Sequence, residues 1–496
     1  MSHGGSCGGT DGLIRLASPA GRWTVAAAVL GSGAVFVEST VVSVALPAIA
    51  RDFGLGMEGL QWLMNAYLLT LSALLLLGGS LGDVYGRRRV FSVGLVGFAA
   101  TSLLCALAPS PLWLVAGRAL QGAAGALLVP NSLAIVDAVF AEEDRGAAIG
   151  KWAGWSAVST ALGPLLGGLL VDVVSWRWVF AATVPICLAA LVAARRVPEA
   201  PRPGPARSVD YGGAVLATAG LAGVVGALVT GPEAGFGRPE ILAAGIGGAA
   251  LLVAFFLAER RARAPLLPLS VFRSRQFAGA NLTTLLVYAA LGGVFFFVVL
   301  QLQNVLGYSA LEVGGALLPI NVLMLVLSPR SGRLSRRTGP RLPMTVGAAL
   351  AAAGMLLLAR VQPGAGYVGT VLPALVVLGV GLGMLVAPLT AAVLGAVDDE
   401  QTGVASAVNN AAARLANLLA TAVLPLAAGL GGLDDLRGPA FAAGYARAMW
   451  ICAGLCAAGA AVAWLTVRNA ASVAPTAHPS PEHGCTHRRP LAEVEA

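Results

Sequence analysis

The sequence predicts an all-α integral membrane protein with fourteen transmembrane helices, because three features of the chain agree. Of 496 residues, 57% are hydrophobic and only 11% are charged, whereas a soluble globular protein has about 25% charged residues. The apolar residues form runs close to the ~20 residues that a helix needs to cross a bilayer. The basic residues lie mostly between those runs, and chiefly on one side of the predicted membrane.

Each apolar run is predicted to be a helix, since backbone groups in lipid must be hydrogen-bonded within the protein. The runs are continuously apolar and lack the alternation that a β-barrel strand needs. The fourteen predicted spans are residues 23–49, 61–82, 90–108, 112–136, 148–170, 177–195, 212–230, 241–258, 277–302, 311–329, 343–360, 367–390, 403–429 and 443–467. The first run contains Glu38 and is too long for a signal peptide, so we predict that it is the first span.

The distribution of basic residues predicts that both termini are cytoplasmic. With that orientation, nineteen Arg and Lys residues lie in inner loops. Six arginines lie outside, namely Arg51, Arg177, Arg238, Arg360, Arg437 and Arg447. Such an excess is typical of the positive-inside rule. The net charge of +8 is thereby explained by topology, and no nucleic-acid partner is expected.

Two similar basic turns indicate an internal repeat. One turn, 79–89, follows the second span, and the other, 332–341, follows the tenth. Repeated halves around a central site are typical of transporters. The predicted organisation is a cytoplasmic tail (1–22), an N-terminal six-helix half (23–196), a linker with two extra transmembrane helices (197–275), a C-terminal six-helix half (276–467) and a disordered cytoplasmic tail (468–496).

The cysteines and histidines predict no disulfide framework, no metal centre and no cofactor. Four of the six cysteines lie within apolar spans, and the other two lie in tails placed in the cytoplasm, where disulfides are rare. His483, Cys485 and His487 form a short cluster in the C-terminal tail, whose role the sequence leaves open.

Two ionisable residues inside the predicted bilayer are candidates for proton coupling, because charges there are costly. Glu38 lies about 22 Å along the first span, and Arg118 lies roughly 10 Å from the external start of the fourth. Both therefore fall in the outer half of the membrane at a similar depth. A static ion pair between helices is the alternative reading.

A polar stripe in the thirteenth span is a candidate for the substrate cavity. Asn410, Arg414 and Asn417 share one helical face, and polar residues in membrane helices face the interior of the bundle. The stripe either lines a cavity or joins helices, and the sequence leaves both open. Asn321, in the tenth span, is a further candidate on the same grounds.

Charged residues near the cytoplasmic ends of the second and fourth spans predict a conformational latch. Asp83 and Arg87 lie beside the basic turn that contains Gly79 and Gly86, and Asp137 ends the fourth span. We expect salt bridges between these helices.

The fifth span contains a run of small residues that allows close backbone packing. Gly163, Gly167 and Gly168 lack side chains, and Pro164 removes one helical hydrogen bond and bends the helix.

Together these motifs resemble the major facilitator superfamily, and in particular its fourteen-span drug:proton antiporter family, over residues 23–467. The run 79–89 (GSLGDVYGRRR) resembles the superfamily's loop signature. The run 118–125 (RALQGAAG), which includes Gln121, matches the family's proton-coupling motif, and 150–168 is similar to its antiporter motif. The resemblance implies the major facilitator fold, proton coupling through Glu38 and Arg118, and a cavity that Gln121 helps to line.

Several positions depart from the family pattern. Glu38 stands where Asp is usual, and Ser159 replaces the first glycine of the antiporter motif. In the second copy of the loop signature, Arg336 occupies the place of the Asp. These changes bear on coupling and substrate range.

The predicted function is a proton-coupled efflux antiporter in the bacterial cytoplasmic membrane, exporting small, lipophilic, drug-like molecules by alternating access. No nucleotide-binding signature or catalytic triad is present, so an enzyme is not expected. Expected partners are a small-molecule substrate, protons and the lipid bilayer, with the protein a monomer. The alternatives are a proton-coupled uptake symporter and a non-transporting membrane sensor with the same fold.

Overall fold

The structure is a computed structural model that describes residues 14–199, 209–262, 267, 269–397 and 401–469. Within these ranges, fourteen helical segments are long and apolar enough to cross a membrane. The β-type pairing in the same ranges is a single isolated bridge between Ile14 and Phe140. The predicted all-α fold with fourteen spans is confirmed.

Helices α1 to α7 provide the first six spans. They are α1 (Pro19–Phe53), α2 (Met57–Tyr85), α3 (Arg87–Ala106), α4 (Pro111–Val139), α5 (Glu142–Val173), α6 (Arg177–Ala181) and α7 (Thr183–Ala194). Ser18 caps α1 by accepting a hydrogen bond from the Gly21 N–H at 3.0 Å, and Pro19 follows at the first helical position, where its missing N–H costs nothing. The sixth span consists of α6 and α7, which meet at Ala182.

The remaining helices form the extra pair and the last six spans. They are α8 (Tyr211–Ala234), α9 (Pro239–Arg261), η1 (Leu269–Arg273), α10 (Arg275–Leu300), η2 (Gln301–Val305), α11 (Ala310–Ala316), α12 (Leu318–Thr338), α13 (Arg341–Leu358), η3 (Tyr367–Val371), α14 (Leu372–Leu394), α15 (Thr402–Ala427) and α16 (Pro439–Thr466). The tenth span is divided between α11 and α12, where Pro319 stands in the first turn of α12 and cannot donate a helical hydrogen bond.

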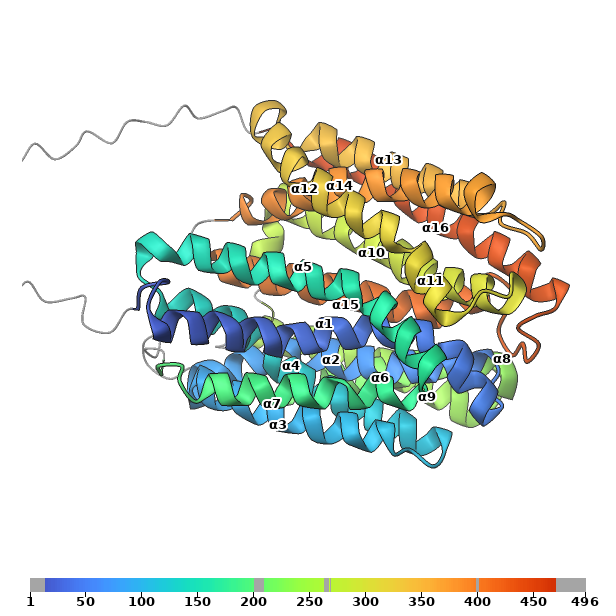
Figure 1. Ribbon diagram of the computed structural model, residues 1–496, viewed down its shortest axis with the longest axis horizontal. Coiled ribbons are helices and arrows are strands. Elements are labelled where there is room, and N and C mark those ends of the chain that lie inside the picture. Colours follow the sequence, from blue (N-terminus) through green and yellow to red (C-terminus); the bar gives the residue numbers. More distant parts are fainter. Residues whose placement is uncertain (1–13, 200–208, 263–266, 268, 398–400, 470–496) are drawn as a thin grey trace, which may run out of the picture.

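The helices form two groups that lie side by side (Figure 1). Helices α1 to α7 pack mainly on one another and form the N-terminal half, and α10 to α16 form the C-terminal half. The halves meet where α5 packs on α11 and where α2 packs on α15. The extra helices α8 and α9 pack together, and α8 lies against α2 and α15.

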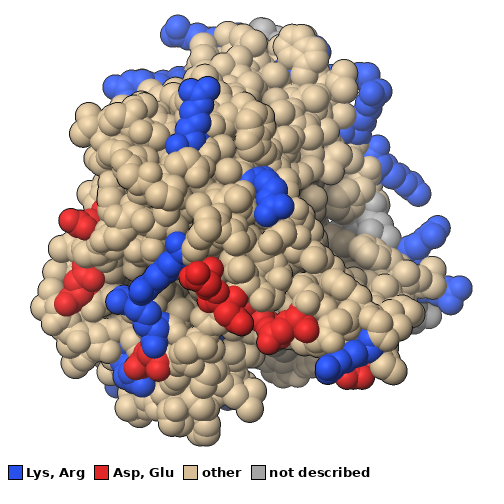
Figure 2. Space-filling model, turned by 90° about the vertical axis from the view of Figure 1, so that its right-hand side faces the viewer, with Lys and Arg blue, Asp and Glu red and all other residues tan. Residues whose placement is uncertain are grey.

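The two ends of the molecule differ in charge. Helix α1 begins and α16 ends at the left in Figure 1, which we call the terminal end, and the opposite end is the distal end. The arginines Arg51, Arg177, Arg238, Arg360, Arg437 and Arg447 lie at or near distal helix ends. Figure 2 shows the distal end, where acidic and basic side chains are mixed. Which end faces the cytoplasm stays a prediction.

The two halves contact each other at the distal end and near the middle. In the described residues, the hydrogen bonds between them join Met57 to Leu433, Asp172 to Ala310 and Leu311, Gln303 to Val44, Asn321 to Ala161, and Gln61 and Asn65 to Thr421, with Gln61 also reaching Ala422. Near the terminal end of α5, a side chain at Gly146, Gly150 or Gly154 would meet no atom within 4 Å. In the described residues, the hydrogen bonds between the halves thus lie at the distal end and near the middle, and none lies at the terminal end.

The internal repeat is visible in the backbone of the two basic turns. Gly86 joins α2 to α3 with φ 100°, and Gly339 joins α12 to α13 with φ 81°. Both values lie in the left-handed region, which glycine adopts without steric cost. Each half thus has a glycine with a positive φ in its basic turn, which is Gly86 alone in the first half and Gly339 followed by Pro340 in the second.

Candidate functional site

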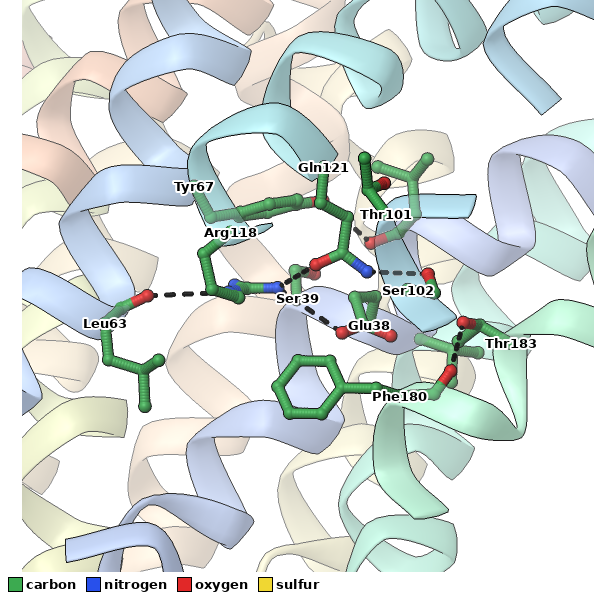
Figure 3. Close-up of polar contacts among 12 residues, drawn as sticks. Glu38, Ser39, Leu63, Tyr67, Thr101, Ser102, Arg118, Gln121, Phe180 and Thr183 are labelled. Carbon is green, nitrogen blue, oxygen red and sulfur yellow. Dashed lines mark hydrogen bonds and ion pairs between the residues drawn. The ribbon is translucent and has the colours of Figure 1, made fainter. Parts of the chain in front are cut away.

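Glu38 of α1 and Arg118 of α4 form an ion pair inside the N-terminal half (Figure 3). Arg118 Nη1 lies 3.3 Å from Glu38 Oε1, and both side chains are 0% exposed. The similar depth that counting along the two spans predicted is therefore matched by direct contact. The pair is shielded from solvent in this conformation.

Arg118 is held by three further contacts. Its Nη1 donates to Gln121 Oε1 at 2.6 Å, and its Nε donates to the Leu63 carbonyl at 3.4 Å. The guanidinium lies over the ring of Tyr67, 4.1 Å from the centroid, a cation–π arrangement. The position of the guanidinium is thus fixed by α2 and α4 as well as by the carboxylate on α1.

Two atoms of the pair are left over. Glu38 Oε2 and Arg118 Nη2 are buried and have no hydrogen-bond partner among the described residues. A buried polar atom without a partner costs about 1–3 kcal/mol. Chemically, the free carboxylate oxygen is a place for a proton, and taking up that proton would remove the charge that Arg118 balances.

Gln121 lies within this network rather than on a cavity wall. It is fully buried, and besides accepting from Arg118 it donates from Nε2 to Ser102 Oγ at 2.8 Å. The predicted cavity-lining position is therefore not what this conformation has. The reason is that Gln121 stands one helical turn from Arg118 and is the nearest acceptor for its guanidinium.

The stripe on α15 is only partly buried. Asn410 is exposed and donates to the Ser406 carbonyl at 3.1 Å, and Asn417 packs against Gly292 of α10. Arg414 Nε is buried without a partner in the described part of the chain, and Arg414 forms no ion pair there. Tyr67, whose ring covers Arg118, belongs to the same hydrophobic cluster as Ala411 and Leu415 of α15, which flank Arg414 in the sequence.

Asn321, the last of the five cavity candidates, lies at the contact between the halves. Its side-chain amide donates to the Ala161 carbonyl of α5 at 3.4 Å. Two surface cavities near the terminal end, of about 300 and 400 Å³, are lined by other residues. None of the five cavity candidates lines either of these two cavities.

Three buried polar residues between α2 and α15 were not predicted. Gln61 donates to the Thr421 carbonyl at 2.8 Å, and the Thr421 hydroxyl donates to Asn65 Oδ1. Gln61 and Asn65 are four residues apart, and Thr421 continues the stripe of Arg414 and Asn417. The spacing rule that found the α15 stripe would also have found these residues.

The predicted latch is formed only in part. Arg87 pairs with Asp83 at 3.0 Å and donates to the Ala134 carbonyl of α4 at 2.9 Å. Asp137 does not contact Arg87 and instead lies 3.9 Å from Arg145. The link from α3 to α4 therefore uses a backbone carbonyl, because Ala134 lies about one turn nearer to Arg87 than the exposed Asp137 does. Gly79 lies near Pro130 of α4.

The glycines of α5 lie at two close approaches. A side chain at Gly163 or Gly167 would strike α1 at Thr40 and Val41, next to Glu38. A side chain at Gly168 would strike the Ala310 backbone, and Gly314 of α11 approaches the Pro164 carbonyl just as closely. Helix α5 therefore contacts both the helix of Glu38 and the opposite half.

The cluster of His483, Cys485 and His487 lies outside the described residues. Within the described ranges, no group of three His, Cys, Asp or Glu side chains is placed to hold a metal ion.

Solved structures with the same fold are transporters. One is a bacterial homologue of the human lysosomal transporter Spinster in an inward-facing conformation, with a TM-score of 0.66 and 18% sequence identity, covering 91% of this chain and 97% of that one. Another is a D-xylose–proton symporter, with a TM-score of 0.64 and 16% identity, covering 90% of this chain and 98% of that one. At these identities the likeness shows the fold alone.

Curated relatives are more similar in sequence. The puromycin resistance protein of Streptomyces alboniger is 39% identical over 79% of this chain and 78% of its own length. The tetracenomycin C resistance and export protein of Streptomyces glaucescens is 38% identical over 81% of this chain and 74% of its own length. The family model of the Major Facilitator Superfamily matches residues 28–421. The chain therefore belongs to the Major Facilitator Superfamily, and it is a membrane transporter and not an enzyme.

Proposed function

We propose that the protein is a proton-coupled efflux antiporter that exports small, antibiotic-like molecules by alternating access. The observation that carries the coupling is the buried Glu38–Arg118 pair, with one carboxylate oxygen left without a partner. The direction of transport is supported by the relatives named for puromycin resistance, tetracenomycin C resistance and export, and cephamycin export.

The proposed orientation places both termini, and thus the terminal end, in the cytoplasm. The conformation described above is then open towards the cytoplasm. Glu38 arrives in this state protonated and releases its proton to the cytoplasm when substrate binds, after which Arg118 balances the charge of the carboxylate. Opening of the distal end then exposes substrate to the outside, where substrate leaves and a proton from outside binds the empty carboxylate before the molecule returns.

Substrate is proposed to bind between the halves, against the α15 stripe. Arg414, Asn410 and Asn417 offer donors and acceptors there, with Asn321 on α12 at the border with α5. Because the ring of Tyr67 covers Arg118 and packs in one cluster with Ala411 and Leu415 of α15, a ligand at Arg414 would change the surroundings of the proton site. This gives a physical route by which substrate and proton compete.

Two further motifs are proposed to control the conformational change. The Asp83–Arg87 pair and its link to the Ala134 carbonyl steady the terminal end of α2, α3 and α4. Gly163, Pro164, Gly167 and Gly168 let α5 move against both α1 and α11, so that a change at Glu38 reaches the contact between the halves.

Inverted membrane vesicles with an imposed pH gradient test the proposal. Substrate-induced proton release is measured across a panel that includes puromycin and tetracenomycin C. We expect release with the native protein and none with Glu38→Gln, because the amide cannot exchange a proton. Glu240→Gln, which changes an exposed carboxylate at the distal end, is the matched control. Normal coupling in Glu38→Gln would contradict the proposal.

The uptake symporter is retained as a second candidate, because a D-xylose–proton symporter shares the fold. Accumulation of substrate in whole cells, driven by the proton gradient, would favour it over export. A non-transporting sensor would show no substrate-dependent proton flux. We further propose that the protein acts as a monomer, which cross-linking in the membrane would test.

A further inference from the structure

We propose that the groove between α1 and α5 at the terminal end is a binding site for one anionic phospholipid. The groove has a volume of about 400 Å³. Two basic side chains, Arg22 and Lys151, stand at it together with the apolar side chains of Val25, Val29, Leu30 and Trp155. It is separate from the Glu38 site and from the α15 stripe.

The charges in the groove are not balanced by the protein. Arg22 and Lys151 are exposed and form no ion pair in the described residues, and no acidic side chain lines the groove. Two of the three acidic residues in the first turn of α5 are already engaged, because Glu143 pairs with Arg15 at 2.7 Å and Asp144 accepts from the Leu16 N–H at 2.8 Å. The groove therefore offers two cations to one anion.

The apolar wall extends from these cations into the membrane. Arg22 lies in the first turn of α1, and Leu30 lies eight residues further, about 12 Å deeper along the axis. Trp155 is one turn deeper than Lys151 on α5, and tryptophan is enriched at membrane interfaces. A phospholipid fits this order, because its charged head group would lie at the two cations and its acyl chain along the apolar side chains. A free phosphate ion would leave the apolar side chains without a partner.

The groove faces the lipid and not the opposite half. On α5, the residues that contact the C-terminal half include Ala161, Pro164, Gly168 and Asp172. At about 100° per residue, Lys151 and Trp155 point roughly a third of a turn away from that face. On α1, Leu30 packs towards the cluster that contains α7. Basic pockets between membrane helices are known to hold lipid head groups.

The single lysine of the chain makes the proposal testable. Lys151 is the one lysine in the sequence. Its rate of acetylation by an uncharged, amine-reactive reagent therefore reports on access to this groove, and the rate at the α-amino group is the internal reference. The full chain is compared in phosphatidylcholine nanodiscs with and without phosphatidylglycerol. We expect severalfold slower acetylation of Lys151 when phosphatidylglycerol is present, and no slowing by inorganic phosphate in phosphatidylcholine discs.

Arg22→Gln should weaken the protection by about fivefold, since one cation near the membrane surface contributes that much to anionic lipid binding. Arg333→Gln, which removes an exposed arginine of α12 at the same end, is the matched control and should leave the protection unchanged. Native mass spectrometry should show fewer retained phosphatidylglycerol molecules for Arg22→Gln than for Arg333→Gln. Equal acetylation in both discs, equal effects of the two substitutions, or protection by inorganic phosphate alone would each overturn the proposal.

Discussion

Two arginines inside the membrane domain have opposite surroundings. Arg118 is 0% exposed, pairs with Glu38 and bonds to Gln121 and the Leu63 carbonyl. Arg414 is partly buried, and its Nε has no partner in the described residues. Arg118 lies over the ring of Tyr67 on α2, and Arg414 lies on α15, which packs against α2 where the halves meet.

The two arginines therefore differ in charge balance. Another residue of the protein neutralises the charge of Arg118, whereas the charge of Arg414 is left uncompensated by the described residues. A charge inside a membrane is costly unless it is paired. Arg118 meets that condition through Glu38, and its charge becomes unbalanced only when Glu38 is protonated. Arg414 does not meet it in this conformation. We therefore expect Arg118 to matter for folding and coupling, and Arg414 to matter for what enters the space between the halves.

Stability gives the largest expected contrast. Arg118→Ala leaves Glu38 buried without its counter-charge, which should destabilise the protein by about 3–5 kcal/mol. Arg414→Ala removes an unpaired charge and should leave stability nearly unchanged or slightly raised. Apparent Tm in detergent, with Arg333→Ala as an exposed control, measures both.

The double variant Glu38→Gln with Arg118→Gln should recover much of the stability lost in Arg118→Ala, because no buried charge is left alone. A large loss in Arg414→Ala, or no recovery in the double variant, would remove the distinction between the two arginines.

Replacing Arg414 should have a large effect on substrate recognition, in contrast to its small effect on stability. Replacing it by Gln removes hydrogen bonds to a charged donor, which contribute about 1.5–3 kcal/mol each, so KM for efflux should rise at least about tenfold. Arg414→Lys keeps the charge and should lose less. Efflux kinetics at fixed pH gradient measure KM and kcat separately. Unchanged KM in Arg414→Gln would place the substrate elsewhere.

Most of the fold could be predicted from the sequence because the bilayer imposes one rule on every span. A run such as 23–49 can cross lipid only as a helix, and α1 extends it by a few residues at each end. The break at Pro319 was not predicted, since a proline inside an apolar run predicts a bend more readily than two separate helices.

The contacts within the site could be predicted only where depth in the membrane determines which residues meet. Glu38 and Arg118 are charged and lie at similar depth, so counting residues was enough to bring them close. The choice of partner among exposed groups was not predictable, and Arg87 bonds to the Ala134 carbonyl where Asp137 was expected. The cavity role of Gln121 stays a prediction, and its contacts with Arg118 and Ser102 in this conformation could not be foreseen, because a cavity wall and a helix interior look alike in one sequence.

Adding a single methyl group should weaken the contact between the halves at the distal end. Gly314→Ala would push a side chain into the Pro164 carbonyl of α5, which should cost about 1–3 kcal/mol and shift the molecule towards a conformation open at the distal end. Gly315→Ala is the matched control, because nothing lies within 4 Å of that position. Labelling of a cysteine introduced at Leu311 should rise for Gly314→Ala alone. Equal labelling would show that this contact does not hold the distal end closed.

The smallest effect is expected at the terminal end, where Asp83→Asn removes an exposed ion pair within one helical turn. Such pairs contribute about 0.3–0.5 kcal/mol, and Arg87 keeps its bond to the Ala134 carbonyl. Apparent Tm should therefore hardly change, while the rate of conformational exchange rises because Arg87 is less restrained. Asp137→Asn, whose partner Arg145 lies 3.9 Å away, should alter neither quantity. If the two substitutions behave alike in exchange measurements by paired spin labels, the link from α3 to α4 does not act as a latch, and control of the terminal end rests with α5.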